Sequence, residues 1–345
     1  MATKSVLVSG GSGYIAGYLI RQLMAEGWTV HTTVRSLARE GAVRRLLAVD
    51  DARLRFFAAD LNADAGWAQA MTGCSHVAHV ASPFPAAAVK DAQQLIVPAR
   101  DGVLRALRAA RAAGVQRFVM TSSVAAIGYG HGDDGSGGGT GRTFTEADWT
   151  VPDSSDALAY VQSKTLAERA ARDWVAAEGQ GLVFCSINPS LVLGPVWSAD
   201  MSTSIELVRR LLSGALPGCP DLAFGIVDVR DVADLHVRAL VAPGLDGERF
   251  IASGPSLKII QIARILKQQL GAQARKVPTR GLPDWLLRLA AVFDPAVRQL
   301  TGELGKLRHY DARHARERLG WVPRPAEQSI VDAARSLLAL GIVKL

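Results

Sequence analysis

Residues 4–34 constrain the fold of this chain more than any other segment. A short apolar stretch at residues 4–9 is followed by a glycine cluster, Gly10, Gly11 and Gly13. Apolar residues then recur at helical spacing through residues 14–26, and residues 28–34 form a second strand-like stretch. This order predicts a β-loop-α-β unit of about 30 residues with its glycines in the turn.

The alternation of strand-like and helix-like segments continues along the chain. It predicts strands at residues 54–59, 76–80, 115–121 and 181–187, and helices at residues 63–71, 96–113 and 156–178. Strands that alternate with helices favour a parallel sheet covered on both faces. We therefore expect an α/β fold: a Rossmann-type doubly wound parallel sheet with helices on both faces.

The pattern changes after Pro189, where turns break up the chain before helices dominate to the end. Two further strand-like segments occur at residues 223–227 and 249–252. We expect a dinucleotide-binding domain at residues 1–188, with later sheet elements from about residues 223–253. Residues 189–222 and 254–345 are expected to form a smaller, mostly helical substrate-binding lobe.

Composition and charge exclude several classes of partner. The chain of 345 residues is 49% hydrophobic, and no apolar run approaches the roughly 20 residues of a membrane helix. The net charge is +7, but basic residues are spread among acidic ones, so we expect neither nucleic acid nor membrane as a partner. Three scattered cysteines and unclustered histidines favour neither disulfides nor a metal site. We expect a cytoplasmic protein, monomeric or homodimeric.

The glycine turn matches a site for a pyrophosphate. Gly10 allows a tight turn, and Gly13 lets the backbone approach an anion. The helix that starts at Tyr14 and Ile15 offers free N–H groups and its dipole. An NAD site places an acidic residue at the end of the second strand, but this chain has Arg35 there, and a guanidinium suits a 2′-phosphate. The sequence therefore predicts NADP(H) as the cofactor.

Two later strand ends extend this predicted cofactor site. After the third strand, Asp60 can accept a hydrogen bond from the adenine amino group and Leu61 can cover the ring. A turn cap is an equally good interpretation of Asp60. After the fourth strand, small residues let the chain pass beneath the cofactor ribose; they are Val80, Ala81 and Ser82.

A tyrosine and a lysine four residues apart form a second constellation. On a helix, Tyr160 and Lys164 share one face, and an ammonium beside a phenol lowers the phenol pKa from about 10. Tyr160 can then exchange a proton with a carbonyl or an alcohol, while Lys164 can bind the nicotinamide ribose. The fifth strand ends at Thr121, expected beside the cofactor, and at two serines that can orient a carbonyl. We favour Ser123, with Ser122 as the alternative.

These motifs, in this order, resemble those of the extended short-chain dehydrogenase/reductase family, within the NAD-dependent epimerase/dehydratase superfamily. The chain is similar to the branch of dihydroflavonol reductases, cinnamoyl-CoA reductases and NADPH aldehyde reductases. The motifs that carry the resemblance cover nearly the whole chain: Gly10-x-x-Gly13-x-x-Ala16, Thr33-Val34-Arg35-Ser36, His79-Val80-Ala81-Ser82-Pro83, Thr121-Ser122-Ser123, Phe144-Thr145-Glu146-Ala147-Asp148-Trp149, Tyr160-x-x-x-Lys164, Asn188-Pro189-Ser190-Leu191-Val192-Leu193-Gly194-Pro195 and Val227-Asp228-Val229-Arg230-Asp231-Val232-Ala233.

The resemblance implies an NADPH-dependent reduction of an aldehyde or ketone to the alcohol. In that reaction Tyr160 would supply the proton, Ser123 would orient the carbonyl, and Lys164 would lower the tyrosine pKa. Pro189 and Ser190 would lie beside the nicotinamide amide.

The chain departs from the family's pattern in two ways that bear on catalysis and cofactor. Its only asparagines are Asn62 and Asn188, so the asparagine that many relatives carry before the fifth strand is absent, and we expect a catalytic triad. A basic residue that flavonoid reductases carry after the second strand falls on Ala42, where Arg39 or Arg44 can substitute.

The expected substrate is a hydrophobic or aromatic carbonyl compound. Flavonoid reductases recognise the substrate ring with a polar residue shortly after the serine. In this chain residues 124–128 are apolar. This difference favours a general aldehyde or ketone over a flavonoid as the substrate. The glycine-rich stretch at residues 128–141 is either a lid or an insertion without function. The expected substrate-binding residues are Ser123, Phe84, Ile127, Tyr129, Val196, Trp197 and Met201.

Two other functions stay open on the same fold. A nucleotide-sugar epimerase or dehydratase needs polar groups for a diphosphate and a sugar, yet residues 191–224 are mostly apolar apart from Arg209 and Arg210. A non-catalytic redox-sensing protein that binds NADP(H) usually lacks the tyrosine-lysine pair, which this chain keeps.

Overall fold

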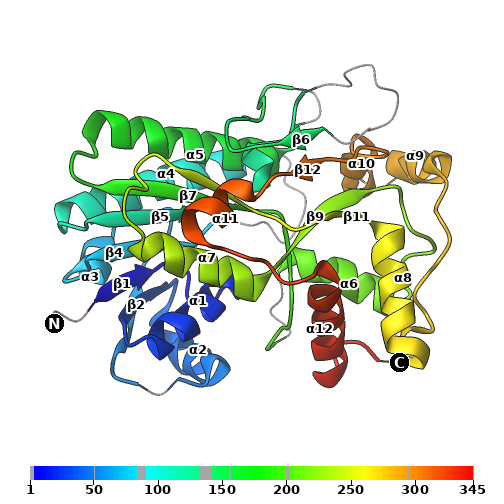
Figure 1. Cartoon of the computed structure of the whole chain (residues 1–345), viewed down its shortest axis with the longest axis horizontal. Helices are drawn as coiled ribbons and strands as arrows, with labels where there is room; N and C mark the ends of the chain where they lie inside the picture. Colours follow the sequence, from blue (N-terminus) through cyan, green and yellow to red (C-terminus); the bar gives the residue numbers. More distant parts are fainter. Residues whose placement is uncertain are drawn as a thin grey trace.

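A seven-stranded parallel sheet with strand order β10-β7-β5-β4-β1-β2-β3 forms the centre of the larger lobe (Figure 1). The computed structural model describes residues 4–49, 51–83, 91–131, 142–154, 157–198, 202–293 and 295–344. Because every pair of strands is parallel, the carboxyl ends meet at one edge, where ligands bind in such sheets. The strands are β1 (Ser5–Val8), β2 (Thr29–Val34), β3 (Leu54–Ala58), β4 (His76–His79), β5 (Arg117–Thr121), β7 (Val183–Pro189) and β10 (Arg249–Ala252).

Helices cover both faces of this sheet, so the predicted Rossmann-type doubly wound fold is confirmed (Figure 1). Buried side chains on one face come from α1 (Tyr14–Ala25), α2 (Glu40–Leu47), α7 (Val229–Val241) and α11 (Arg313–Leu319). Buried side chains on the other face come from α3 (Trp67–Met71), α4 (Gln93–Ala112) and α5 (Ala159–Glu178).

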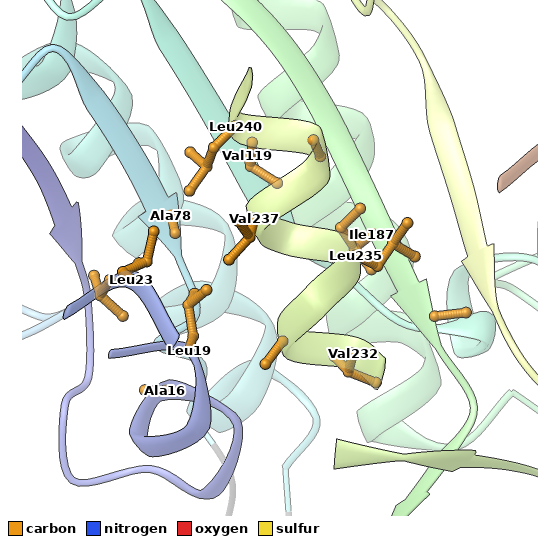
Figure 2. Close-up of a cluster of buried hydrophobic side chains, with 14 of the residues drawn as sticks. Ala16, Leu19, Leu23, Ala78, Val119, Ile187, Val232, Leu235, Val237 and Leu240 are labelled. Atoms are coloured by element: carbon orange, nitrogen blue, oxygen red, sulfur yellow. The ribbon is translucent and has the colours of Figure 1, made fainter. Parts of the chain in front are cut away.

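Aliphatic side chains fill the space between α1, α7 and the sheet. Leu19 and Leu23 lie one helical turn apart on α1 and are fully buried, as are Leu235 and Leu240 on α7. Figure 2 shows these side chains between the two helices and strands β4, β5 and β7. Each such side chain contributes about 1.5–3 kcal/mol by leaving water, which holds the strand ends in fixed relative positions.

A smaller lobe follows β7. Its sheet has the order β11-β9-β8, built from β8 (Leu191–Leu193), β9 (Ala223–Asp228) and β11 (Ser256–Lys258). Apolar residues of α6 (Thr203–Ser213), α8 (Ile259–Leu270) and α12 (Ala326–Ala339) pack in its core. The segments α9 (Asp284–Phe293) and α10 (Pro295–Thr301) lie at its outer end (Figure 1).

The two late strands that the sequence predicts join different sheets. Arg249–Ala252 pairs with β7 in the central sheet, as expected. Ala223–Asp228 does not join that sheet, because it pairs with β8 and β11 in the smaller lobe. A short apolar run in the sequence predicts a strand but not the sheet to which it belongs, because tertiary contacts determine which strands pair.

The remaining elements join the two lobes. The strands β6 (Thr143–Phe144) and β12 (His309–Tyr310) pair in parallel and bring the segment before α5 against the C-terminal part of the chain. The described residues also include the short 3-10 helices η1 (Leu37–Arg39), η2 (Val124–Ala126) and η3 (Gly271–Ala274).

The packing of α1 predicts a difference in stability between two leucine substitutions. Leu19→Ala removes a fully buried side chain and should lower the free energy of unfolding by about 2–5 kcal/mol. Leu340→Ala, at a position with 45% of the side chain exposed, should change it by no more than about 0.5 kcal/mol. Urea unfolding followed by circular dichroism measures both, and equal losses would contradict the packing described for α1.

Candidate active site

The glycine turn between β1 and α1 is held by backbone contacts to β2. Gly10 has a φ of +73°, and its N–H donates to the Thr33 hydroxyl over 2.9 Å. Gly11 N–H donates to the Thr33 carbonyl over 2.8 Å. Gly13, the N-cap of α1, has no side chain to bond the first turn, and that turn contains no acidic residue. The N–H groups at Tyr14 and Ile15 therefore point to a place suited to an anion.

The end of β4 lies directly against this turn. A Cβ atom on Gly10 would stand 3.1 Å from the Cβ of Ala81, so a larger residue at position 10 would crowd the crossing. Ala81 N–H donates to the Ser9 hydroxyl over 2.9 Å, and that hydroxyl is 3.2 Å from Nδ1 of the buried His79. Val80 and Ser82 flank Ala81 and are half-buried. The glycine turn, the start of α1 and the end of β4 thus lie together, at the place where the sequence predicts the dinucleotide; we call this group the dinucleotide cradle.

The ends of β2 and β3 supply the residues predicted for the adenosine half. Arg35 is exposed, and among the described residues its guanidinium forms no ion pair. Arg44 is engaged elsewhere, because it pairs with Glu40 at 2.8 Å and donates to the Leu54 carbonyl at 2.6 Å. Of the basic residues considered for a 2′-phosphate, Arg35 is thus better placed than Arg44.

Asp60 caps a turn. Its Oδ1 accepts hydrogen bonds from the backbone N–H of Asn62 at 2.8 Å and from the Asn62 side chain at 2.9 Å. This geometry matches the turn-cap interpretation and leaves the adenine contact as a prediction. Leu61 packs closely against Gly102 of α4, where a Cβ would meet its side chain at 2.8 Å.

The structure brings Tyr160, Lys164 and Ser123 together beside the ends of β5 and β7. Tyr160 and Lys164 lie one turn apart on α5, and the Ser123 side chain is near enough to the Tyr160 phenol to lower its pKa. The Lys164 ammonium is buried and lies 3.5 Å from the Thr121 carbonyl. The Ser123 hydroxyl also lies 3.4 Å from the carbonyl of Pro189, the last residue of β7. Ser190 follows, with its N–H donating to the Ala252 carbonyl at 3.0 Å.

Three successive hydroxyls at the end of β5 face different partners. The Thr121 hydroxyl lies 2.6 Å from Nε2 of His236 on α7, whose Nδ1 is 2.8 Å from the Val232 carbonyl. The Ser122 hydroxyl donates to the Glu168 carboxylate over 2.5 Å. Of these three hydroxyls, it is that of Ser123 that meets Tyr160. Both serines follow the end of β5 and face α5, and the Ser122 hydroxyl is already bonded to Glu168. The contacts therefore favour Ser123, whose role in orienting a carbonyl stays a prediction.

Burial dominates the electrostatics of this site. It lowers the pKa of Lys164 to about 8, although the Glu168 carboxylate raises it. It raises the pKa of Tyr160, while the hydrogen bond with Ser123 lowers it. In the protein alone the phenol pKa thus lies above its ordinary value, which differs from the lowering by Lys164 that the sequence predicts. The phenol is the protonated, proton-donating form at neutral pH.

The residues predicted for the substrate pocket are placed less uniformly. Tyr129 packs in one small cluster with Tyr160, and the Arg308 guanidinium lies 4.1 Å from its ring centroid. Ile127 is fully buried in the main core and Val196 is 5% exposed in the small-lobe core, so neither presents much surface to a substrate. Trp197 stacks on Tyr18 of α1 with 4.0 Å between ring centroids. Phe84, Met201 and residues 132–141 of the glycine-rich stretch lie outside the described residues.

Two buried charged residues near the site, Glu168 and Arg249, lie outside the sequence motifs, and Asn188 opens a motif but was given no role. Glu168, Asn188 and Arg249 form one hydrogen-bonded cluster behind Ser122 and Ser123. One signal was present: Glu168 stands eight residues after Tyr160 on the same face of α5. Another was Arg249, a charge at the start of the apolar strand β10, which requires a buried partner.

The described part of the chain contains neither a cluster of metal ligands nor a membrane-spanning helix. No group of three or more His, Cys, Asp and Glu side chains there could hold a metal ion. None of the described helices is long and apolar enough to cross a membrane.

Comparison with known proteins identifies the family. The model of the NAD dependent epimerase/dehydratase family matches residues 6–251. The chain belongs to this family. A cinnamoyl-CoA reductase, CAD2 of Medicago truncatula, is 36% identical over 276 residues, which are 76% of this chain and 80% of that protein. An anthocyanidin reductase ((2S)-flavan-3-ol-forming) of Vitis vinifera is 31% identical over 291 residues, 80% of this chain and 83% of that protein.

A solved structure supports the same branch of the family. Gre2 of Candida albicans in complex with NADPH superimposes with a TM-score of 0.80 and 26% identity, covering 98% of this chain and 99% of that one. The resemblance to the reductase branch of the extended short-chain dehydrogenases/reductases is therefore confirmed. The chain is an oxidoreductase of this family.

The contacts of the two serines predict contributions to stability of different size. Ser122→Ala removes one of the donors to the buried Glu168 carboxylate and should lower the free energy of unfolding by about 1–3 kcal/mol. Ser123→Ala removes only longer contacts, of 3.1 and 3.4 Å, and should lower it by less than about 1 kcal/mol. Chemical denaturation of the two variants decides this, and a larger loss for Ser123→Ala would contradict the described roles.

Proposed function

We propose that this protein is an NADPH-dependent carbonyl reductase that converts a hydrophobic or aromatic aldehyde or ketone to the alcohol. The observation that carries the proposal is the contact between Tyr160 and Ser123, with Lys164 one turn away, beside the dinucleotide cradle. Bound NADPH would supply the hydride. The reductases among its relatives support the same class of reaction.

The protonation states suit a reduction. Burial raises the pKa of Tyr160, so its phenol carries the proton that the new alkoxide needs. Ser123 is placed to donate to the same carbonyl oxygen and so to orient it. Lys164, with its pKa lowered by burial to about 8, is mostly cationic at neutral pH and stabilises negative charge as it develops on the phenol.

The cofactor preference is carried by the adenosine end of the cradle. Arg35 stands at the end of β2, where an acidic residue would select NAD. Its exposed guanidinium can pair with a 2′-phosphate, and Gre2 of Candida albicans, which shares the fold, is solved with NADPH. The first turn of α1 and the β4 end at Ala81 would hold the pyrophosphate and the ribose.

A nucleotide-sugar epimerase or dehydratase is less well supported. Such an enzyme needs free cationic groups for the diphosphate in the small lobe. The two arginines that the sequence offers there are both paired with one residue of α6: Arg209 binds Glu206 at 2.6 Å and Arg210 binds it at 2.9 Å. This pairing favours the carbonyl reductase.

The first test is turnover of a panel of aromatic and aliphatic aldehydes and ketones, followed by loss of NADPH absorbance. Tyr160→Phe should lower kcat by about 10²–10⁴-fold while NADPH still binds, because only the proton donor is removed. Thr72→Val also removes one hydroxyl, which donates to the Ala68 carbonyl at an exposed position before β4, so it is the control and should keep its activity. NADPH binding without turnover of any compound would instead favour the redox-sensing function.

Arg35 provides a separate test of the cofactor. Arg35→Gln should raise the KM for NADPH by about 10–100-fold and leave the KM for NADH nearly unchanged, because a charged hydrogen bond to the phosphate is lost. Arg45→Gln, at an exposed position on α2, makes the same change in net charge and should alter neither KM. Better turnover of the unaltered protein with NADH would contradict the role given to Arg35.

A further inference from the structure

Glu168 is a carboxylate with no exposed surface in the centre of the larger lobe. It lies on α5 one turn beyond Lys164 and two turns beyond Tyr160. Its oxygens accept hydrogen bonds from five described side chains: Ser122 at 2.5 Å, Asn188 at 2.8 Å, Arg249 at 2.8 Å, Ser186 at 2.9 Å and Arg172 at 3.4 Å. Both oxygens of this buried carboxylate therefore accept hydrogen bonds. Such a network fixes the relative positions of the side chains that donate to the carboxylate.

The donors to Glu168 sit at the two strand ends that surround the Ser123 hydroxyl. Ser122 precedes Ser123 at the end of β5, and Asn188 precedes Pro189 at the end of β7. The Asn188 amide also donates to the Ser123 carbonyl over 3.1 Å. One carboxylate therefore sets the spacing between these strand ends and the helix that carries Tyr160.

Arg249 extends the same cluster toward the segment that precedes α5. It is 6% exposed and donates to the carbonyls of Glu146 at 2.8 Å and Asp148 at 2.7 Å. Its guanidinium lies 3.8 Å from the centroid of the Trp149 ring and 3.3 Å from the Ala126 carbonyl in η2, directly after Ser123. The pair of Glu168 and Arg249 thus joins helix, strand ends and the 3-10 turn around one hydroxyl.

Stability alone is a weak reason for such a cluster. Burying an ion pair costs desolvation free energy that its attraction only partly repays, and well-packed apolar residues are often as stable. The charge is also placed where it acts on chemistry. The titratable groups that face Lys164 are Glu168 and Tyr160 on α5 and His79 on β4, and the Thr121 carbonyl faces it from β5.

Of these groups, Glu168 supplies the negative charge. Burial, with a smaller contribution from Lys164, lowers the pKa of His79 to about 3, so that ring is neutral. Burial raises the pKa of Glu168, but Arg249 and Arg172 outweigh it and hold that pKa below its ordinary value. Glu168 therefore stays ionised wherever the protein works.

We propose that the Glu168 carboxylate positions the active site: it holds the strand end that carries Ser123 and places a negative charge one turn from Lys164. Arg249 keeps that carboxylate in place. The inference rests on the proposed reductase function, but part of its test does not need turnover.

The test compares Glu168→Gln with Glu178→Gln, an exposed position at the end of the same helix. Glu168→Gln should lower kcat by about 10–100-fold, since it loosens Ser123 against Tyr160. Activity should also fall at lower pH than in the unaltered protein, because Lys164 without its carboxylate loses its proton earlier. Glu178→Gln should change neither kcat nor the pH profile.

Arg249→Lys separates position from charge. It keeps the cation beside Glu168 but loses the bonds to the carbonyls of Glu146, Asp148 and Ala126. Arg249→Lys should lower kcat, but its activity should be lost at the same high pH as in the unaltered protein, because the charge of Glu168 remains. Urea unfolding shows which variants are folded. If Glu168→Gln does not fold, Arg249→Lys is the variant that tests the inference.

The dissociation constant of NADPH against pH, measured by fluorescence, is the readout independent of turnover. Binding should weaken as Lys164 loses its proton, at lower pH in Glu168→Gln than in the unaltered protein. If NADPH binds with this shift but no carbonyl compound reacts, the proposed function fails and the inference stands. Folded Glu168→Gln with unaltered kcat and unaltered pH dependence overturns the inference, and so does a protein that binds no NADPH.

Discussion

The parallel arrangement of the central sheet is the constraint on which the rest of the structure depends. Seven strands that run in one direction place the ends of β1, β4, β5 and β7 at a single edge. The glycine turn, the small residues after β4, the serines after β5 and Pro189 after β7 consequently become neighbours, although they are far apart in the chain. The cores on both faces of the sheet keep that edge rigid.

The helix α5 uses this edge by presenting one face to it. Tyr160, Lys164 and Glu168 follow at intervals of four residues, so they stand in a row from the surface toward the interior. The row changes from a half-buried phenol to a buried ammonium and then to a buried carboxylate. Proton donor, cation and counter-charge are therefore ordered by burial on a single rigid element.

The sequence predicted the fold, and it pointed to the candidate site residues, because those features repeat with a local period. The β-loop-α-β unit, the alternation of strands and helices, and the four-residue spacing of Tyr160 and Lys164 all depend on neighbours in the chain. It did not predict that Ala223–Asp228 would leave the central sheet, because strand pairing is a long-range choice. The sequence analysis also placed Ile127 and Val196 in a substrate pocket, whereas in the structure these side chains are buried in two separate hydrophobic cores.

The sequence by itself determined the class of fold and the family, and it supplied the candidate residues for the chemistry, since these follow from spacing and residue type. Only the tertiary structure decided which hydroxyl at the end of β5 meets Tyr160 and which is bonded to Glu168. Both serines follow the end of β5 and face α5, so the packing of that helix against the strand end, not the order Thr-Ser-Ser, separates their roles. The pairing of Glu168 with Arg249, 81 residues later, was likewise settled by folding, because two buried charges are stable only where the chain brings them together.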